Sequence, residues 1–241
     1  MNFAFHMRPM AKPCIRKNIF SHVSSFFDPM GYITPVTILA KRSCKIYVNE
    51  RQTWVKEIFG EALTLWRKWL NEIHNLEHFT SEKAKANYEF QLHVFSNASE
   101  TIYGAVAYMQ KRIIFPKARI APIPAINIPR LEPIAVEVAV KVAKLIRTNI
   151  RAKISITFFS SDSLVVLQSI RHISKRFSTL SNRCSLIHDL FSPDEWRYIE
   201  SSRNPANLLS HGVFTNETNN PERCKNASEL PAVLTEQALL T

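Results

Sequence analysis

The stretch Leu92 to Met109, "LHVFSNASETIYGAVAYM", decides how the fold of this 241-residue chain is interpreted. Its two apolar runs, at residues 92–97 and 103–109, are typical of β-strands, and Ser99 to Thr101 forms a polar turn between them. A third run, "KRIIFPKARI" at residues 111–120, is again rich in β-branched and aromatic residues. The sequence therefore predicts a meander of three antiparallel strands.

The chain after this meander alternates between helix and strand patterns. The clearest helix is predicted at residues 131–150, where apolar residues recur at three- and four-residue spacing. The β-branched run "ISITFF" at 154–159 is typical of a buried strand, and Ser160 and Ser161 are predicted to cap the helix that follows. This order indicates an α/β domain with a mixed sheet and flanking helices. The remaining predictions are a helix over 178–191, a short strand over 195–200 and a polar turn, "SSRNPANLLSHG".

The chain divides into regions of different composition. Residues 1–45 hold seven Lys or Arg against one Asp, with several prolines, and predict a mostly extended basic arm. Within it, "FFDPMGYITPV" combines turn signals with apolar residues, which predicts an ordered loop packed on a neighbouring element. The predicted regions are 1–49, the basic arm and ordered loop; 50–90, an amphipathic helix and a polar linker; 91–212, the α/β domain; and 213–241, a mostly disordered tail rich in Asn, Glu, Thr and Pro.

The amphipathic helix is predicted over residues 50–76, where apolar side chains recur at helical spacing. It contains Trp54, Trp66 and Trp69. Three tryptophans could form a platform on which nucleic-acid bases stack. We favour the alternative that they are core or helix-docking residues, because two of them lie on the apolar stripe of the helix.

Charge and cysteine content restrict the class of protein. The chain carries a formal net charge of +11, with a pI near 9.7, and such an excess favours polyanionic partners such as nucleic acid. The four cysteines lie far apart and form no metal-binding pair. No secretion signal is recognised at the N-terminus, so an intracellular protein, cytoplasmic or nuclear, is expected. Charged residues interrupt the longest apolar segment, at 131–146, so no membrane span is expected.

Five motifs, in order, carry a resemblance to a known family: "FDPMGYITPV", "LHVFSNASETIYGAVAY", "INIPRLEPIAV", "FFSSDSLVVLQSI" and "WRYIESSRNPANLLSHG". The sequence resembles the polyprotein of BEL/Pao-type LTR retrotransposons, from the Pao retrotransposon peptidase family region after the reverse transcriptase through the ribonuclease H-like domain. The resemblance implies an RNase H-like fold that acts on the RNA strand of an RNA–DNA hybrid. It also implies two Mg²⁺ ions that hold the attacking water and the leaving oxygen.

The resemblance assigns four catalytic positions. The family's aspartate of "FSDAS" falls on Asn97, the glutamate of "PRLEL" on Glu132, the aspartate of "TDS" on Asp162, and the aspartate of "NPADLLSRG" on Asn207. An amide keeps the shape of a carboxylate but removes its charge, and half of the group becomes a hydrogen-bond donor. Asn97 and Asn207 are therefore expected to be non-functional, and Glu132 and Asp162 are the expected metal ligands.

Two further departures from the family pattern affect the same site. Pro133 replaces the expected leucine and is predicted to lie in the first helical turn, where it turns Glu132 away from helical geometry. His211 replaces the arginine of "SRG". Without the resemblance, Glu132 would only complement a helix dipole and Asp162 would only begin a helix.

These observations predict a retrotransposon-derived polyprotein fragment with a degenerate RNase H-like domain. We expect it to be catalytically impaired, with weak or lost Mg²⁺ binding, and at most to bind nucleic acid such as an RNA–DNA hybrid. One alternative is a weakly active endonuclease in which Glu132 and Asp162, with Asp189, hold one metal ion. Another is a non-enzymatic interaction module whose helix at 50–76 docks a partner in place of the parent polyprotein's reverse transcriptase-like domain.

Overall fold

A computed structural model of the chain describes residues 13–26, 28, 30–49, 54–73, 90–109, 112–171 and 187–212. Three sequence predictions fall wholly or largely outside these residues. They are the linker at 77–90, of which only Phe90 is described, the helix at 178–191, of which only residues 187–191 are described, and the tail at 213–241.

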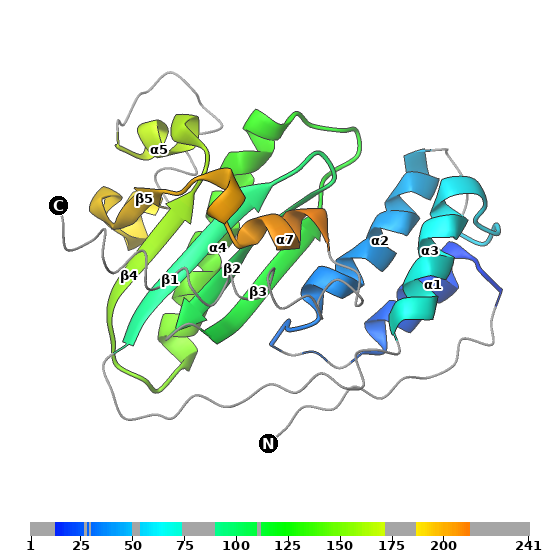
Figure 1. The fold of residues 1–241 in the computed structure, drawn as a ribbon, viewed down its shortest axis with the longest axis horizontal. Coiled ribbons are helices and arrows are strands. Elements are labelled where there is room, and N and C mark those ends of the chain that lie inside the picture. The colour runs from blue at the N-terminus through cyan, green and yellow to red at the C-terminus, as the bar shows by residue number, and fades with distance from the viewer. Residues whose placement is uncertain are drawn as a thin grey trace.

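A five-stranded mixed sheet forms the centre of the fold, with strand order β3-β2-β1-β4-β5 (Figure 1). The pairs β1–β2 and β2–β3 are antiparallel, which confirms the predicted meander, and the pairs β1–β4 and β4–β5 are parallel. This is the predicted α/β architecture. The strands are β1 (Phe90–Ala98), β2 (Ile102–Met109), β3 (Arg112–Ile120), β4 (Ile154–Ser161) and β5 (Trp196–Tyr198).

Helices cover both faces of this sheet. Alternate residues of each strand point to opposite faces, so apolar side chains on each face can pack against helices. Leu92 and Val94 of β1 belong to the larger apolar core together with residues of α4 (Ile128–Asn149). Phe95 of β1 belongs to a second core on the other face, with Leu209 of α7 (Ala206–His211). The remaining helical segments of this domain are α5 (Leu164–Arg171) and the 3-10 turns η2 (Pro193–Glu195) and η3 (Ser201–Arg203).

Two predictions about helix starts are wrong. Helix α4 begins at Ile128, with Pro129 in its first turn, so Pro133 lies inside the helix and Glu132 keeps helical geometry. Ser160 and Ser161 belong to β4 and do not cap α5. Ser163 has that role, since its hydroxyl oxygen accepts a hydrogen bond from the backbone N–H of Val166 (3.4 Å).

The predicted extended arm is helical instead. Its described residues include α1 (Arg16–Ser24) and α2 (Thr34–Asn49), which pack with α3 (Gly60–Glu72) into a separate apolar core. The turn signals around residues 26–35 form the predicted ordered loop, and this loop separates two helices that the prolines and weak periodicity of the arm did not indicate. The amphipathic helix predicted from residue 50 begins only at Gly60, where its N-cap Phe59 has extended backbone.

The buried tryptophans support the core interpretation. Trp66 and Trp69 are 0% and 1% exposed and stack on each other with ring centroids 5.0 Å apart. The indole N–H of Trp69 donates to the backbone oxygen of Val36 in α2 (2.8 Å). Trp54 precedes α3 and is 51% exposed, so it is not part of this core. The prediction of core or helix-docking residues is therefore confirmed: Trp66 and Trp69 are core residues, and the ring of Trp54 lies against Phe20 of α1, with centroids 5.6 Å apart.

The loop before α2 packs against the edge strand β3, as the prediction of an ordered loop required. Both carboxylate oxygens of Asp28 accept backbone N–H hydrogen bonds, from Tyr32 and Ile33 (2.9 Å each). Gly31 has a positive φ of 79°, and a Cβ there would lie 2.4 Å from the backbone oxygen of Pro116. The three helices and the sheet are thus joined at this loop. None of the described helices is long and apolar enough to cross a membrane.

Candidate functional site

Parallel pairing of β1 and β4 places two of the predicted site positions side by side. Ser96 of β1 is in register with Ser161 of β4. Asn97 is the next residue of β1 and Asp162 follows the end of β4 directly, so both lie at the same edge of the sheet. In α/β sheets, polar groups at the carboxyl ends of parallel strands line the usual ligand-binding crevice.

The two predicted amides contact each other. The Nδ2 group of Asn97 donates hydrogen bonds to the side-chain oxygen of Asn207 and to the hydroxyl of Ser210, the latter at 2.7 Å. Asn97 is 8% exposed, so this amide bonds to neighbouring side chains in a site largely shielded from water. The Nδ2 group of Asn207 in turn donates to the backbone oxygen of Ser201. Asn97, Asn207 and Ser210 form what we call the amide cluster.

Further polar contacts fix α7 against the sheet. The hydroxyl of Ser99 donates to the backbone oxygen of Ser210 (2.8 Å), and Asn204 donates its Nδ2–H to the backbone oxygen of Ser96 (3.0 Å). The ring Nδ1 of His211 lies 2.9 Å from the backbone oxygen of Asn207. Because a carbonyl oxygen only accepts, this nitrogen carries the proton in that hydrogen bond. The predicted polar turn at Asn207 is therefore a short helix held by hydrogen bonds at its start and at its end.

Glu132 projects from α4 and meets the segment after β4. Its carboxylate accepts a hydrogen bond from the hydroxyl of Ser163 (2.6 Å). Burial raises the pKa of Glu132, the Ser163 hydrogen bond lowers it, and the negative charge of Asp162 raises it again. Glu132 and Asp162 therefore lie close enough to repel each other.

The structure joins the predicted positions in two pairs, Asn97 with Asn207 and Glu132 with Asp162. Each pair also contacts a serine that local sequence patterns did not reveal. Ser163 and Ser210 each contact one of these positions directly. Both lie in motifs that carried the resemblance, "SSDS" and "NLLSHG", but a serine beside an aspartate or in a turn has many ordinary roles. Their partners are distant in sequence, 31 and 113 residues away, so no local pattern could identify them.

The residues present do not fit a centre with two Mg²⁺ ions. Such ions need several carboxylate or carbonyl oxygens, and an amide N–H cannot face a cation. The N–H groups of Asn97 occupy the space toward Asn207 and Ser210. Within the described parts of the chain, no three His, Cys, Asp or Glu side chains gather closely enough to hold a metal ion, so Asp189 does not join Glu132 and Asp162.

A comparison with known protein families identifies the family to which this chain belongs. The family model described as the Pao retrotransposon-like RNaseH-like domain matches residues 15–163. The chain belongs to this family. The match spans the helical unit and the sheet through Asp162, which confirms the resemblance found in the motifs. It ends before α7, so the assignment of Asn207 in this Pao-family chain depends on the carried-over motif and on its contact with Asn97.

Solved structures show the same fold at low sequence identity. A foamy viral protease-reverse transcriptase dRH in complex with double-stranded DNA is 14% identical, with a TM-score of 0.51 over 79% of the Pao-family chain. A second foamy viral structure, also with double-stranded DNA, is 11% identical, with a TM-score of 0.49 over 79%. The chain spans only 33% and 39% of those two proteins.

A third solved structure matches a smaller share of the chain. The enzyme LC11-RNase H1, solved in complex with an RNA/DNA hybrid, is 13% identical, with a TM-score of 0.37 over 48% of this chain and 88% of its own. No curated protein sequence matches the chain. The family match over residues 15–163 identifies an RNase H-like domain of a retroelement in this chain.

Proposed function

We propose that this Pao-family domain is a catalytically impaired RNase H-like module that binds nucleic acid of the RNA–DNA hybrid type, with weak or lost Mg²⁺ binding. One observation carries the proposal: the side-chain N–H of Asn97 donates to the side-chain oxygen of Asn207. These are the two positions at which the resemblance expects metal-binding aspartates. A neutral amide pair there supports loss of the metal centre.

Electrostatic repulsion between the two metal ions explains why the loss of two carboxylates is enough to weaken Mg²⁺ binding. Two divalent cations about 4 Å apart repel each other strongly and need several carboxylates to offset that repulsion. The two amides remove two negative charges from the site. Only Glu132 and Asp162 remain, and one oxygen of Glu132 already accepts a hydrogen bond from Ser163.

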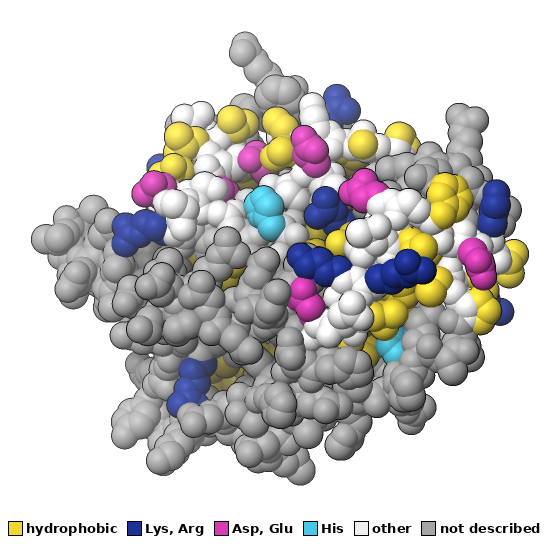
Figure 2. Space-filling view, turned by 45° about the vertical axis from the view of Figure 1, so that its right-hand side comes forward, with side chains coloured by type: hydrophobic (Ala, Val, Ile, Leu, Met, Phe, Trp, Pro, Cys, Tyr) yellow, Lys and Arg dark blue, Asp and Glu magenta, His cyan; other side chains and the backbone are white. Residues whose placement is uncertain are grey.

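The charge of the surface supports the binding half of the proposal. Figure 2 shows Lys and Arg side chains close together near the middle of one face of the molecule, with hydrophobic side chains and some Asp or Glu side chains beside them. The chain carries a net charge of +11. Lys and Arg side chains supply the phosphate contacts that dominate nucleic-acid affinity and make it depend on salt. Exposed basic residues include Arg112, Lys117 and Arg119 of β3 and Lys141, Lys144 and Arg147 of α4.

The decisive experiment compares the natural chain with an Asn97→Asp/Asn207→Asp variant. Both are incubated with an RNA–DNA hybrid in Mg²⁺ or Mn²⁺, and cleavage of the RNA strand is measured. We expect the natural chain to bind the hybrid without cleaving it, and the variant to gain cleavage. Rapid cleavage by the natural chain would show that the proposal is wrong.

A weakly active enzyme is the second candidate, because the two remaining acids lie within range of each other's charge. In that case Mn²⁺ would support slow cleavage by the natural chain, and Asp162→Asn would abolish it.

The interaction-module alternative has less support. Helix α3 buries Ala62, Trp66 and Trp69 in the chain's own helical core, so its apolar face is not available to a partner such as a reverse transcriptase-like domain.

A further inference from the structure

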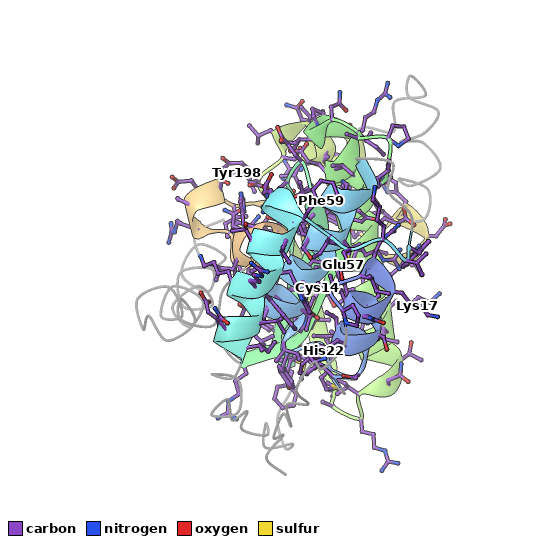
Figure 3. The ribbon with its side chains drawn as sticks, turned by 90° about the vertical axis from the view of Figure 1, so that its right-hand side faces the viewer. Cys14, Lys17, His22, Glu57, Phe59 and Tyr198 are labelled. Carbon is purple, nitrogen blue, oxygen red and sulfur yellow. The ribbon has the colours of Figure 1, made fainter. Side chains whose placement is uncertain are left out.

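A cavity of about 200 Å³ lies where the helical unit meets the edge of the sheet. It is several times the roughly 30 Å³ that a water molecule takes up in the liquid. Its walls come from α1, the loop before α2, α2 itself and β3, and they include Asp28, Thr34, Thr37, Lys41, Pro116 and Lys117. Figure 3 views the molecule from the side of the three helices, with the labelled His22 near the end of α1 that lines this cavity. None of the amide cluster residues is part of it.

The backbone of the loop shapes this cavity. Gly31, one of its lining residues, approaches the backbone of Pro116 too closely for a Cβ. The carboxylate of Asp28 is turned toward its own loop, because both of its oxygens accept backbone N–H bonds from Tyr32 and Ile33. The hydrogen bonds of Asp28 therefore stay within its own loop, and its carboxylate forms no ion pair with the lysines of the cavity wall.

Two lysines give the cavity an excess of positive charge. Lys41 is half-buried, and its pKa is lowered first by burial, second by the positive charge of Lys117, while Asp28 raises it least. No carboxylate of the described residues forms an ion pair with either lysine. The cavity wall thus has two ammonium groups and one carboxylate, which leaves it a net positive charge. A bound anion would offset this charge.

We propose that this cavity is a binding site for a phosphate group, held by the ammonium groups of Lys41 and Lys117 with help from the hydroxyl of Thr34. Lysine binds phosphate as a point charge, and hydroxyl groups donate to phosphate oxygens. The phosphate is either a small free anion or a diester in the backbone of a bound nucleic acid. The second source rests on the proposed nucleic-acid binding, whereas the first does not.

The test uses the full chain and two probes. Calorimetry measures binding of inorganic phosphate at constant ionic strength set with chloride. Separately, the affinity for an RNA–DNA hybrid is measured across a range of salt concentrations. The variant Lys41→Gln/Lys117→Gln removes both cations of the cavity. The matched control, Arg67→Gln/Arg151→Gln, removes two exposed positive charges elsewhere.

If the source is a free anion, the cavity variant binds inorganic phosphate at least about tenfold more weakly and the control stays within about twofold. If the source is a diester, the cavity variant lowers the salt slope of hybrid affinity by about one to two, more than the control does. If the double variant fails to fold because Lys41 is half-buried, the single variant Lys117→Gln at the exposed position is measured in its place. Equal behaviour of cavity and control variants in both measurements overturns the proposal. Failure of the natural chain to bind any hybrid counts against the proposed function and leaves the phosphate measurement intact.

Discussion

The side-chain amide of Asn97, at the end of β1, donates a hydrogen bond to the side-chain oxygen of Asn207 in α7, 110 residues later in the chain. This contact joins the sheet to the helix that covers its second face. The link here is neutral and needs no ion.

We predict that Asn97→Asp/Asn207→Asp lowers stability in the absence of divalent cations. Asn97 loses its donor to Ser210, and the two new carboxylates repel each other, at a cost of about 1–3 kcal/mol. Mg²⁺ should restore part of this loss, because it binds only the folded state. Thermal unfolding with EDTA and with Mg²⁺ measures both effects. The control Asn71→Asp/Gln168→Glu adds two charges at exposed positions and should respond to neither condition. A variant as stable as the natural chain in EDTA would contradict a structural role for the amide cluster.

We predict that Glu132→Gln stabilises the chain at neutral pH. A raised pKa means that the folded state disfavours the carboxylate, so this unfavourable contribution appears as the pH rises through the ordinary range of glutamate, near 4.3. The amide removes the charge and can still accept from Ser163. Because Glu132 is half-buried, water screens its charge and the gain stays below about 1 kcal/mol. Urea unfolding at pH 7 and pH 4 should show a gain only at pH 7, and an equal gain at both would argue against a charge effect.

Acid should weaken the fold through His93, which is 7% exposed and stacks on Phe158 with ring centroids 5.2 Å apart. Burial lowers its pKa, so the folded state keeps the ring neutral while the unfolded state takes up a proton below about pH 6.5. Stability therefore falls as the pH drops below that value, by at most about 1.4 kcal/mol per pH unit from this residue. His22, whose pKa burial also lowers, acts in the same direction.

The variant His93→Phe isolates this contribution. It should flatten the pH dependence of unfolding between pH 6.5 and pH 5. An unchanged profile in His93→Phe would show that His93 is not the titrating group.

A methyl group at Gly31 should be far more costly than one at Gly60. Both glycines have a positive φ, 79° and 60°, so alanine is strained at each by about 1–2 kcal/mol. Only at Gly31 would the new Cβ meet another backbone atom, 2.4 Å from the oxygen of Pro116. We expect Gly31→Ala to lose at least about 2 kcal/mol more than Gly60→Ala in chemical unfolding. Similar losses in the two variants would mean that the loop does not press against β3.

The buried tryptophan pair should contribute much of the stability of the helical unit. Trp66→Ala removes a fully buried ring and should cost about 3–5 kcal/mol. Trp69→Phe keeps most of the apolar surface but loses the hydrogen bond to Val36, at about 1 kcal/mol. The exposed Trp54→Phe is the control and should change the free energy of unfolding by less than about 0.5 kcal/mol. A large effect of Trp54→Phe with none at Trp66 would contradict the packing described above.

Local patterns predicted the elements whose signals lie within a few residues. Alternating and β-branched runs located β1 to β4, and helical spacing located α4. The same reasoning failed for α1 and α2, because prolines and basic residues obscure their short apolar stripes. These helices are stabilised by packing against α3, and Ile19 and Leu39 are buried only in that shared core.

The sequence by itself determined the family, the mixed α/β sheet and the identity of the four candidate positions, because ordered motifs and residue periodicity are properties of the linear chain. Only the tertiary structure decided that Asn97 and Asn207 bond to each other, that Ser163 holds Glu132, and that Lys41 and Lys117 share one cavity. Each of these pairs joins residues 31 to 110 positions apart, and only packing of the sheet, its covering helices and the helical unit brings them together. Hydrogen-bond direction and burial depend on that packing, so no local pattern could have specified them.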